Sequence, residues 1–184
     1  VFLPLIVTRV HFFSTYFEYV FPIVIAGAVI ILTGLIDDVR ELAPLPKLLG
    51  ILFAALIIWF FTDFHFDSFK IPFGGPLLVF PTWLAFCLTV LWIVAITNAI
   101  NLIDGLDGLV AWVSIISLLT MGIVSYFFLY DSNIFLSLTI FVLVAAIAGF
   151  LPYNYHPAII YLGDTGALFI GFMIGVCSLQ GLKT

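Results

Sequence analysis

Long apolar runs, separated by short polar segments, dominate the chain. Seven such runs can be followed, over residues 1–7, 21–36, 48–61, 80–100, 109–130, 134–153 and 167–182. A helix that crosses a bilayer needs about 20 apolar residues, and its backbone groups must bond within the segment. The six longer runs therefore predict spanning helices, whereas residues 1–7 are expected to end a truncated span. The runs lack the alternation of a membrane barrel, so the prediction is an all-α polytopic bundle.

Five polar segments connect these runs. They cover residues 37–47, 62–79 and 98–108, a turn around 131–133, and residues 154–166. In the first connection, Pro44 and Pro46 are expected to break the helix before Lys47 restarts it. The second connection carries spaced apolar side chains followed by Gly74 and Gly75, which predicts a short amphipathic ribbon lying on the membrane surface.

The order of the spans places the acidic residues together. Each span reverses the side of the membrane, so the first, third and fifth connections share one face. Five aspartates belong to these connections: Asp37, Asp38, Asp104, Asp107 and Asp164. We therefore expect one acidic face, with the ribbon on the other.

Composition supports a membrane protein. The 184 residues are 65% hydrophobic and 8% charged, whereas an average soluble domain has about 25% charged residues. The net charge of −5 lacks the basic footprint of a nucleic-acid binder, so the expected surroundings are a lipid bilayer. Cys87 and Cys177 lie in apolar runs and are expected to be free thiols. The chain starts with Val1 and ends in mid-pattern, which indicates a single transmembrane domain over residues 1–184, truncated at both ends.

Asp37 and Asp38 close the second apolar run. Carboxylates are unfavourable at the C-terminal end of a helix, and two adjacent carboxylates repel each other. A solvated loop start and a site that needs a cation or a proton both fit this pattern.

The third connection places polar groups at three-residue spacing. They are Asn98, Asn101, Asp104 and Asp107. Neighbouring members share a face if the segment is helical, and Gly105 lets the backbone approach a ligand closely. Amides and carboxylates beside a membrane span are costly unless they are used, so this segment is a candidate binding loop.

The fifth connection presents Asp164 between Gly163 and Thr165. The carboxylate fits either a helix N-cap or a metal ligand, and His156 nearby is a single imidazole. The sequence contains no cysteine–histidine cluster, which disfavours zinc. Oxygen ligands suit Mg²⁺, which commonly joins one or two carboxylates to substrate phosphates.

Three motifs, in this order, resemble those of the polyprenyl-phosphate N-acetylhexosamine-1-phosphate transferases. They are Gly34-Leu-Ile-Asp-Asp38 followed by Lys47-Leu-Leu, then Asn98-Ala-Ile-Asn-Leu-Ile-Asp-Gly-Leu-Asp-Gly-Leu109, then His156-Pro-Ala-Ile-Ile-Tyr-Leu-Gly-Asp-Thr-Gly166. The second motif is most similar to the branch that uses UDP-GlcNAc. The likeness is strongest to the enzymes that start wall teichoic acid or other surface polysaccharides in Gram-positive bacteria.

The resemblance implies a reaction and a location. Undecaprenyl phosphate attacks the β-phosphorus of UDP-GlcNAc, UMP leaves, and undecaprenyl-diphospho-GlcNAc stays in the membrane. The implied cofactor is Mg²⁺, with Mn²⁺ as the alternative ion. The implied location is the bacterial plasma membrane, crossed several times, with a cytoplasmic acidic face and an extracytoplasmic ribbon. A homodimer is one assembly that the sequence leaves open.

The resemblance also implies roles for individual residues. Catalytic roles fall to Asp37, Asp38 and Lys47. Nucleotide binding falls to Asn98, Asn101, Asp104, Gly105 and Asp107. The metal ligands are Asp164 and Asp37, so Asp37 carries two expectations.

Three other functions compete with this one. A phospho-MurNAc-pentapeptide translocase would use a related donor in the same chemistry. An ion-coupled membrane transporter would need acids inside the spans, and the spans are nearly free of them. An intramembrane aspartyl protease would need two carboxylates that share a proton within the membrane, and it gives the Asn101 segment no role.

Overall fold

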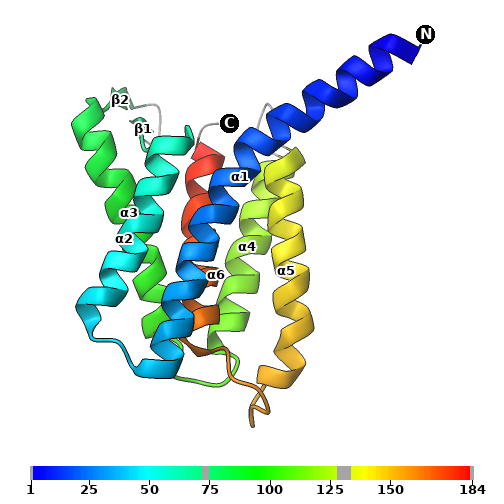
Figure 1. The fold of residues 1–184 in the computed structure, drawn as a ribbon. Coiled ribbons are helices and arrows are strands. Elements are labelled where there is room, and N and C mark those ends of the chain that lie inside the picture. The colour runs from blue at the N-terminus through cyan, green and yellow to red at the C-terminus, as the bar shows by residue number, and fades with distance from the viewer. Residues whose placement is uncertain (1, 72–74, 128–133, 183–184) are drawn as a thin grey trace.

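The computed structural model describes residues 2–71, 75–127 and 134–182. These residues form six helices and one two-stranded hairpin (Figure 1). In chain order the elements are α1 (Phe2–Arg40), α2 (Pro44–Phe61), β1 (Ser68–Lys70), β2 (Leu77–Val79), α3 (Thr82–Leu102), α4 (Leu109–Phe127), α5 (Ile134–Asn154) and α6 (Gly163–Leu182).

Each of the six helices contains a stretch long and apolar enough to cross a membrane. The predicted polytopic all-α bundle is therefore confirmed. Residues 2–7, expected to end a truncated span, continue without a break into the next apolar run, because α1 is one helix from Phe2 to Arg40. Residues 8–20 contain neither glycine nor proline, so no helix-breaking residue separates the first two apolar runs.

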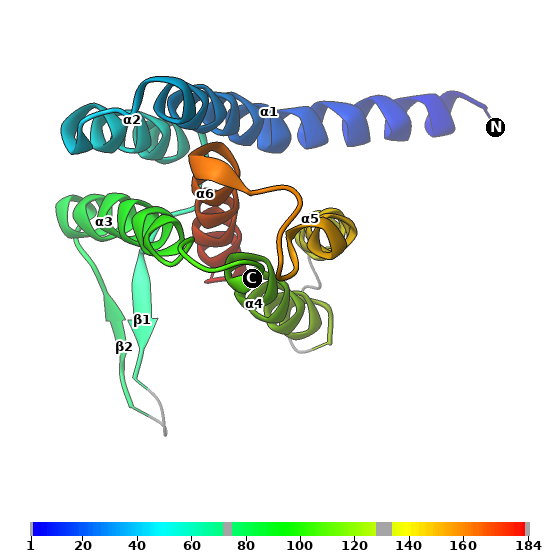
Figure 2. The same cartoon turned by 90° about the horizontal axis from the view of Figure 1, so that it is seen from below.

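Helix α6 lies at the centre of the bundle. It packs against α1, α3 and α4, and touches α5 on the remaining side (Figure 2). In its spanning stretch 56% of the residues are buried, against 22 to 39% in the other helices. Gly171 allows this close packing, since a Cβ there would lie 2.9 Å from the Cα of Thr97 in α3. Helices α3 and α6 therefore pack closely at this level of the bundle.

Three helix boundaries beside the first and third connections differ from the prediction. Helix α1 continues through Asp37 and Asp38 to Arg40, so the first connection is only residues 41–43. Pro44 begins α2 instead of breaking a helix, because proline needs no backbone donor in the first turn. Helix α3 likewise runs to Leu102 and includes both asparagines of the second motif.

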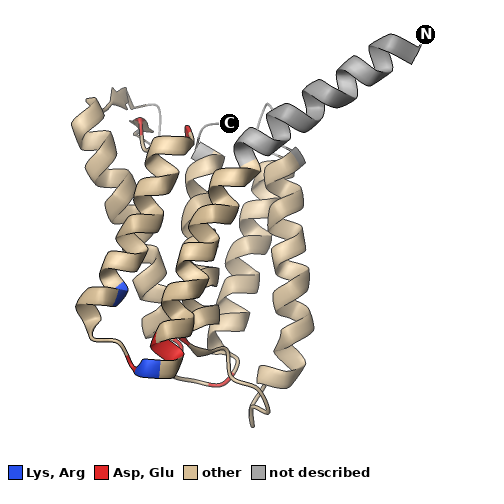
Figure 3. Ribbon diagram, viewed as in Figure 1, with Lys and Arg blue, Asp and Glu red and all other residues tan. Residues whose placement is uncertain are grey.

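The predicted ribbon is an antiparallel hairpin, with Phe69 opposite Leu78. It lies at one end of the bundle, and connections 41–43, 103–108 and 155–162 lie at the other (Figure 1). We call these three connections, with the helix ends beside them, the acidic face. Acidic residues gather at this end (Figure 3). The aspartates of all three motifs lie in these connections or in the helix ends beside them, as the alternation of spans across the membrane predicted. The predicted turn at 131–133 lies outside the described residues.

Candidate functional site

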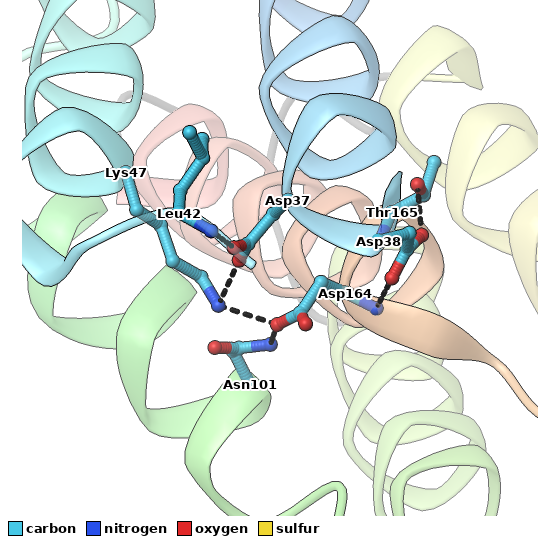
Figure 4. A network of polar contacts seen from close by, with 7 residues as sticks. All are labelled: Asp37, Asp38, Leu42, Lys47, Asn101, Asp164 and Thr165. Carbon is cyan, nitrogen blue, oxygen red and sulfur yellow. Dashed lines mark hydrogen bonds and ion pairs between the residues drawn. The ribbon is translucent and has the colours of Figure 1, made fainter. Parts of the chain in front are cut away.

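Lys47 joins two aspartates at the acidic face. Its ammonium, from the first turn of α2, lies 2.6 Å from Oδ2 of Asp37 and also bonds Oδ1 of Asp164 (Figure 4). The side chains of Lys47 and Asp37 are 17% and 6% exposed. A cation between two carboxylates offsets their mutual repulsion, so these residues form one charged unit.

Both oxygens of the Asp37 carboxylate have partners. Its Oδ1 accepts a hydrogen bond from the backbone N–H of Leu42 at 2.7 Å, and its Oδ2 faces Lys47. Glu41 turns the chain between them with a left-handed φ of 45°. These partners offset the unfavourable position of Asp37 at the C-terminal end of α1.

Asp164 receives a second donor from α3. The side-chain amide of Asn101 donates to Oδ1 of Asp164 at 2.6 Å. Helices α1, α2, α3 and α6 thus each contribute one side chain to a single network (Figure 4). We call Asp37, Lys47, Asn101 and Asp164 the lysine cluster.

The neighbouring Asp38 points elsewhere. Its Oδ1 accepts from the backbone N–H of Asp164 at 2.7 Å, and its Oδ2 accepts from the N–H of Thr165 at 3.1 Å and from the Thr165 hydroxyl. The carboxylate therefore caps the first turn of α6, where the helix dipole favours negative charge. A carboxylate from α1 fills the capping role that the sequence suggested for Asp164.

A polar pocket of about 330 Å³ opens at this face. Six residues of its lining were predicted site residues: Asp38, Asn101, Asp104, Gly105, Asp107 and Asp164. Five further lining residues were not among them: Leu106, Asn154, Tyr161, Leu162 and Gly163. Asp37, Lys47 and Asn98 are not part of the lining, and the side-chain amide of Asn98 donates to the Val94 carbonyl at 2.9 Å within α3.

Asp104 lies in surroundings that disfavour its charged form. Its burial, together with the nearby carboxylates of Asp164 and Asp38, raises the pKa of Asp104. A cation or a proton in the pocket would relieve this cost.

Asp107 links the third connection to the fifth through two polar contacts. Its Oδ2 accepts from the N–H of Ala158 at 3.1 Å and lies 3.0 Å from Nδ1 of His156. These two contacts lower the pKa of Asp107. His156, single in the sequence, thus has a carboxylate partner on the exposed edge of the pocket.

Asn154 makes a second tie between the same connections. Its Oδ1 accepts from the N–H of Gly108 at 3.1 Å, and its Nδ2 donates to the carbonyl of Ile160 at 3.1 Å. Asn154 is buried. Its only sequence signal was one amide at the end of an apolar run, and its partners are 46 and 6 residues away.

The described residues allow a test of the expected metal site. They contain no group of three or more His, Cys, Asp or Glu side chains placed to hold a metal ion. Mg²⁺ commonly needs only one or two carboxylates when phosphates supply further oxygens. Asp164 and Asp104 both border the pocket and offer that donor type, whereas both oxygens of Asp37 already have partners.

Six spanning helices and a carboxylate-lined pocket at one end define a multi-pass membrane protein with a polar site at its boundary. The chain belongs to glycosyl transferase family 4, whose family model matches residues 20–182. All three motifs and the whole lysine cluster lie within the matched region.

Curated relatives carry more specific names. A probable undecaprenyl-phosphate N-acetylglucosaminyl 1-phosphate transferase of Bacillus subtilis (strain 168) is 43% identical over 160 residues, 87% of this chain and 43% of the relative. A decaprenyl-phosphate N-acetylglucosaminephosphotransferase of Mycolicibacterium smegmatis is 36% identical, over 85% of this chain and 40% of the relative. A phospho-N-acetylmuramoyl-pentapeptide-transferase of Listeria innocua is 33% identical, over 68% and 39%. The chain thus spans about two fifths of the length of these relatives.

Proposed function

We propose that the complete protein transfers GlcNAc-1-phosphate from UDP-GlcNAc to undecaprenyl phosphate. The observation that carries this proposal is the lysine cluster beside the polar pocket, in a chain 43% identical to the Bacillus relative. A half-buried cation and several carboxylates at a membrane boundary suit a reaction between a charged nucleotide sugar and a lipid phosphate.

The proposed reaction exchanges one phosphoanhydride for another. An oxygen of the lipid phosphate forms a bond to the β-phosphorus of UDP-GlcNAc, and the bond from that phosphorus to the bridging oxygen breaks. UMP leaves with the bridging oxygen and its electron pair. The product is undecaprenyl-diphospho-GlcNAc, and no oxidant or reductant is needed. Catalysis of phosphoryl transfer is largely positioning and charge stabilisation.

The proposed roles follow from the contacts. Lys47 supplies positive charge to the diphosphate, and Asp37 fixes the ammonium in place through its ion pair. Asn101 and Lys47 orient Asp164. Asp164 with Asp104 would hold Mg²⁺, or Mn²⁺, which supplies charge neutralisation on the diphosphate when bound. Asp107 and Gly105 border the pocket as nucleotide contacts.

The proposed location is the bacterial plasma membrane, with the acidic face in the cytoplasm. The donor sets this orientation, because UDP-sugars are made and held in the cytoplasm. The hairpin then lies outside. A homodimer remains a prediction, which cross-linking of the protein in native membranes would check.

A second donor deserves a direct comparison. The Listeria relative is named for phospho-N-acetylmuramoyl-pentapeptide and is 33% identical to this chain. The two relatives named for N-acetylglucosamine are 43% and 36% identical and cover more of it. This difference favours UDP-GlcNAc, while the chemistry at the diphosphate is the same for both donors.

The test is a transfer assay in membranes that contain the complete protein. Labelled UDP-GlcNAc and undecaprenyl phosphate are supplied with Mg²⁺, and label is measured in the lipid fraction. We expect label in the lipid, none with Asp164→Asn, and none after chelation with EDTA. Label only from UDP-MurNAc-pentapeptide would replace the donor in this proposal. No label from any sugar nucleotide would overturn the transferase.

A further inference from the structure

Asp37 and Asp38 are adjacent in sequence but serve different partners in the structure. Asp37 faces Lys47, whereas Asp38 accepts three hydrogen bonds from the first turn of α6. Three donors on two oxygens leave the carboxylate of Asp38 heavily occupied, although it borders the pocket. A group so engaged is poorly placed to take a proton from a substrate.

The surrounding backbone is shaped around this contact. Gly163 has a left-handed φ of 67°, and a Cβ at that position would lie 3.1 Å from both oxygens of Asp38. On α1, a Cβ at Gly34 would lie 2.4 Å from the Cα of Thr165. The two glycines let the last turns of α1 and the first turn of α6 approach closely enough for the carboxylate to reach the backbone donors.

The contact between Asp38 and the first turn of α6 affects the position of Asp164. One of the N–H groups that Asp38 accepts is that of Asp164 itself, whose side chain bonds Lys47 and Asn101. Fixing the backbone of Asp164 limits where its carboxylate can lie and keeps it within reach of Lys47 and Asn101. We propose that Asp38 is a positioning residue, which holds Asp164 in its working orientation through the first turn of α6 and exchanges no proton with substrate. This inference rests on the proposed transferase function.

The test compares Asp38→Asn with Thr165→Val in the complete protein. Thr165→Val removes one donor to Asp38 and retains the backbone N–H. We expect Thr165→Val to lower kcat about tenfold, as for one hydrogen bond to a charged group. Asp38→Asn should lower kcat on the order of 100-fold, the scale of a misplaced reacting group. Thr165→Ser, which retains the hydroxyl, should restore most of the rate lost in Thr165→Val.

The decisive measurement is the double variant. If both residues act through one contact, adding Thr165→Val to Asp38→Asn should change kcat less than about twofold. The residual activity of Asp38→Asn should also keep the wild-type pH profile. Multiplicative losses, or the disappearance of the acid limb of the profile in Asp38→Asn, would overturn the proposal and make Asp38 a proton acceptor. Thr139→Val, which removes a hydroxyl that donates to the Phe135 carbonyl within α5, is the matched control.

A readout without turnover separates this inference from the proposed function. Hydrogen exchange at the amides of Asp164 and Thr165 should be slow in the wild type and in Thr165→Ser, and at least about tenfold faster in Asp38→Asn. Equal exchange in the wild type and in Asp38→Asn would overturn the positioning role, whether or not the protein transfers GlcNAc-1-phosphate.

Discussion

At the scale of single residues, Lys47 is the cation that compensates the negative charge of Asp37 and Asp164. Its ammonium lies between two carboxylates, one of them only 6% exposed. Removing one partner of a buried pair leaves an uncompensated charge, which typically costs about 3 kcal/mol or more. Stability and transfer should therefore both depend on this one side chain.

We expect Lys47→Met to lower the free energy of unfolding by about 3 kcal/mol and to abolish transfer. Adding Asp37→Asn should restore most of the stability but not the activity, because the buried charge is gone while the cation is still missing. Unfolding by SDS titration, followed by circular dichroism, measures the first effect. Arg40→Met, at an exposed cation on the same face, is the control, and a Lys47→Met protein as stable as the wild type would contradict the prediction.

Asp107 gives a pH-dependent prediction. Its pKa is lowered by the N–H of Ala158 and by His156, so its contribution to stability is present above its unfolded pKa of about 3.9. That contribution is lost as the pH falls through the lower folded value. Asp107→Asn should therefore destabilise the protein at pH 7, and the difference from the wild type should shrink steadily below about pH 4. Unfolding measured across this range checks the sign, and a gap that widens in acid would refute it.

The sequence predicted which residues gather at this face better than it predicted their partners. The residue spacing, and the rule that each span reverses the side of the membrane, were enough to place Asp104, Asp107 and Asp164 at one face. The pairing of Asp38 with the first turn of α6 joins residues 126 and 127 positions apart, and no local pattern encodes it. Asn154 was missed for the same reason, since its role depends on a hydrogen bond from the N–H of Gly108, 46 residues earlier in the chain.

At the scale of elements, the ends of α1 and α6 meet with opposite polarity. The C-terminal end of α1 is negative and the N-terminal end of α6 is positive, and Asp38 links them. Gly34 sets the distance between the two helices, because any Cβ there would overlap the Thr165 backbone.

Gly34→Ala should therefore force α1 away from α6. We expect it to lower the free energy of unfolding by about 1 to 3 kcal/mol, the usual cost of overpacking, and to lower transfer at least about tenfold. Gly149→Ala on α5 is the matched control, since a Cβ there meets no atom within 4 Å. Thermal unfolding in detergent and the transfer assay check both variants, and equal behaviour of the two would show that the close contact is unimportant.

Element types were predictable because apolar length is a strong signal in a membrane protein. The boundaries were less so. Helices α1 and α3 extend past their apolar runs through Asp37 and Asn101, because polar side chains at a membrane boundary can remain helical once they find partners. An apolar run marks only the part of a helix that lies in lipid, whereas the helical hydrogen bonds can continue past the membrane boundary.

At the scale of the whole molecule, the site and the hairpin occupy opposite ends of the bundle (Figure 1). The proposed orientation places Arg40 in the cytoplasm and Asp67, which is 51% exposed, outside. In a background with Cys87 and Cys177 replaced by serine, Asp67→Cys should react with a membrane-impermeant maleimide in intact cells. Arg40→Cys should react only after permeabilisation. The reverse pattern would place the acidic face outside and remove the source of UDP-GlcNAc.

The hairpin, at the end of the bundle away from the site, is also a suitable place to attach an antibody fragment for electron cryomicroscopy. Its strands are joined at the end of the bundle that carries no part of the lysine cluster. A short epitope placed between Lys70 and Leu77 would let an antibody fragment attach far from the reacting groups. Electron cryomicroscopy of such a small, lipid-embedded particle needs an external mass for alignment. Attached there, that mass would leave the pocket open to the proposed nucleotide sugar.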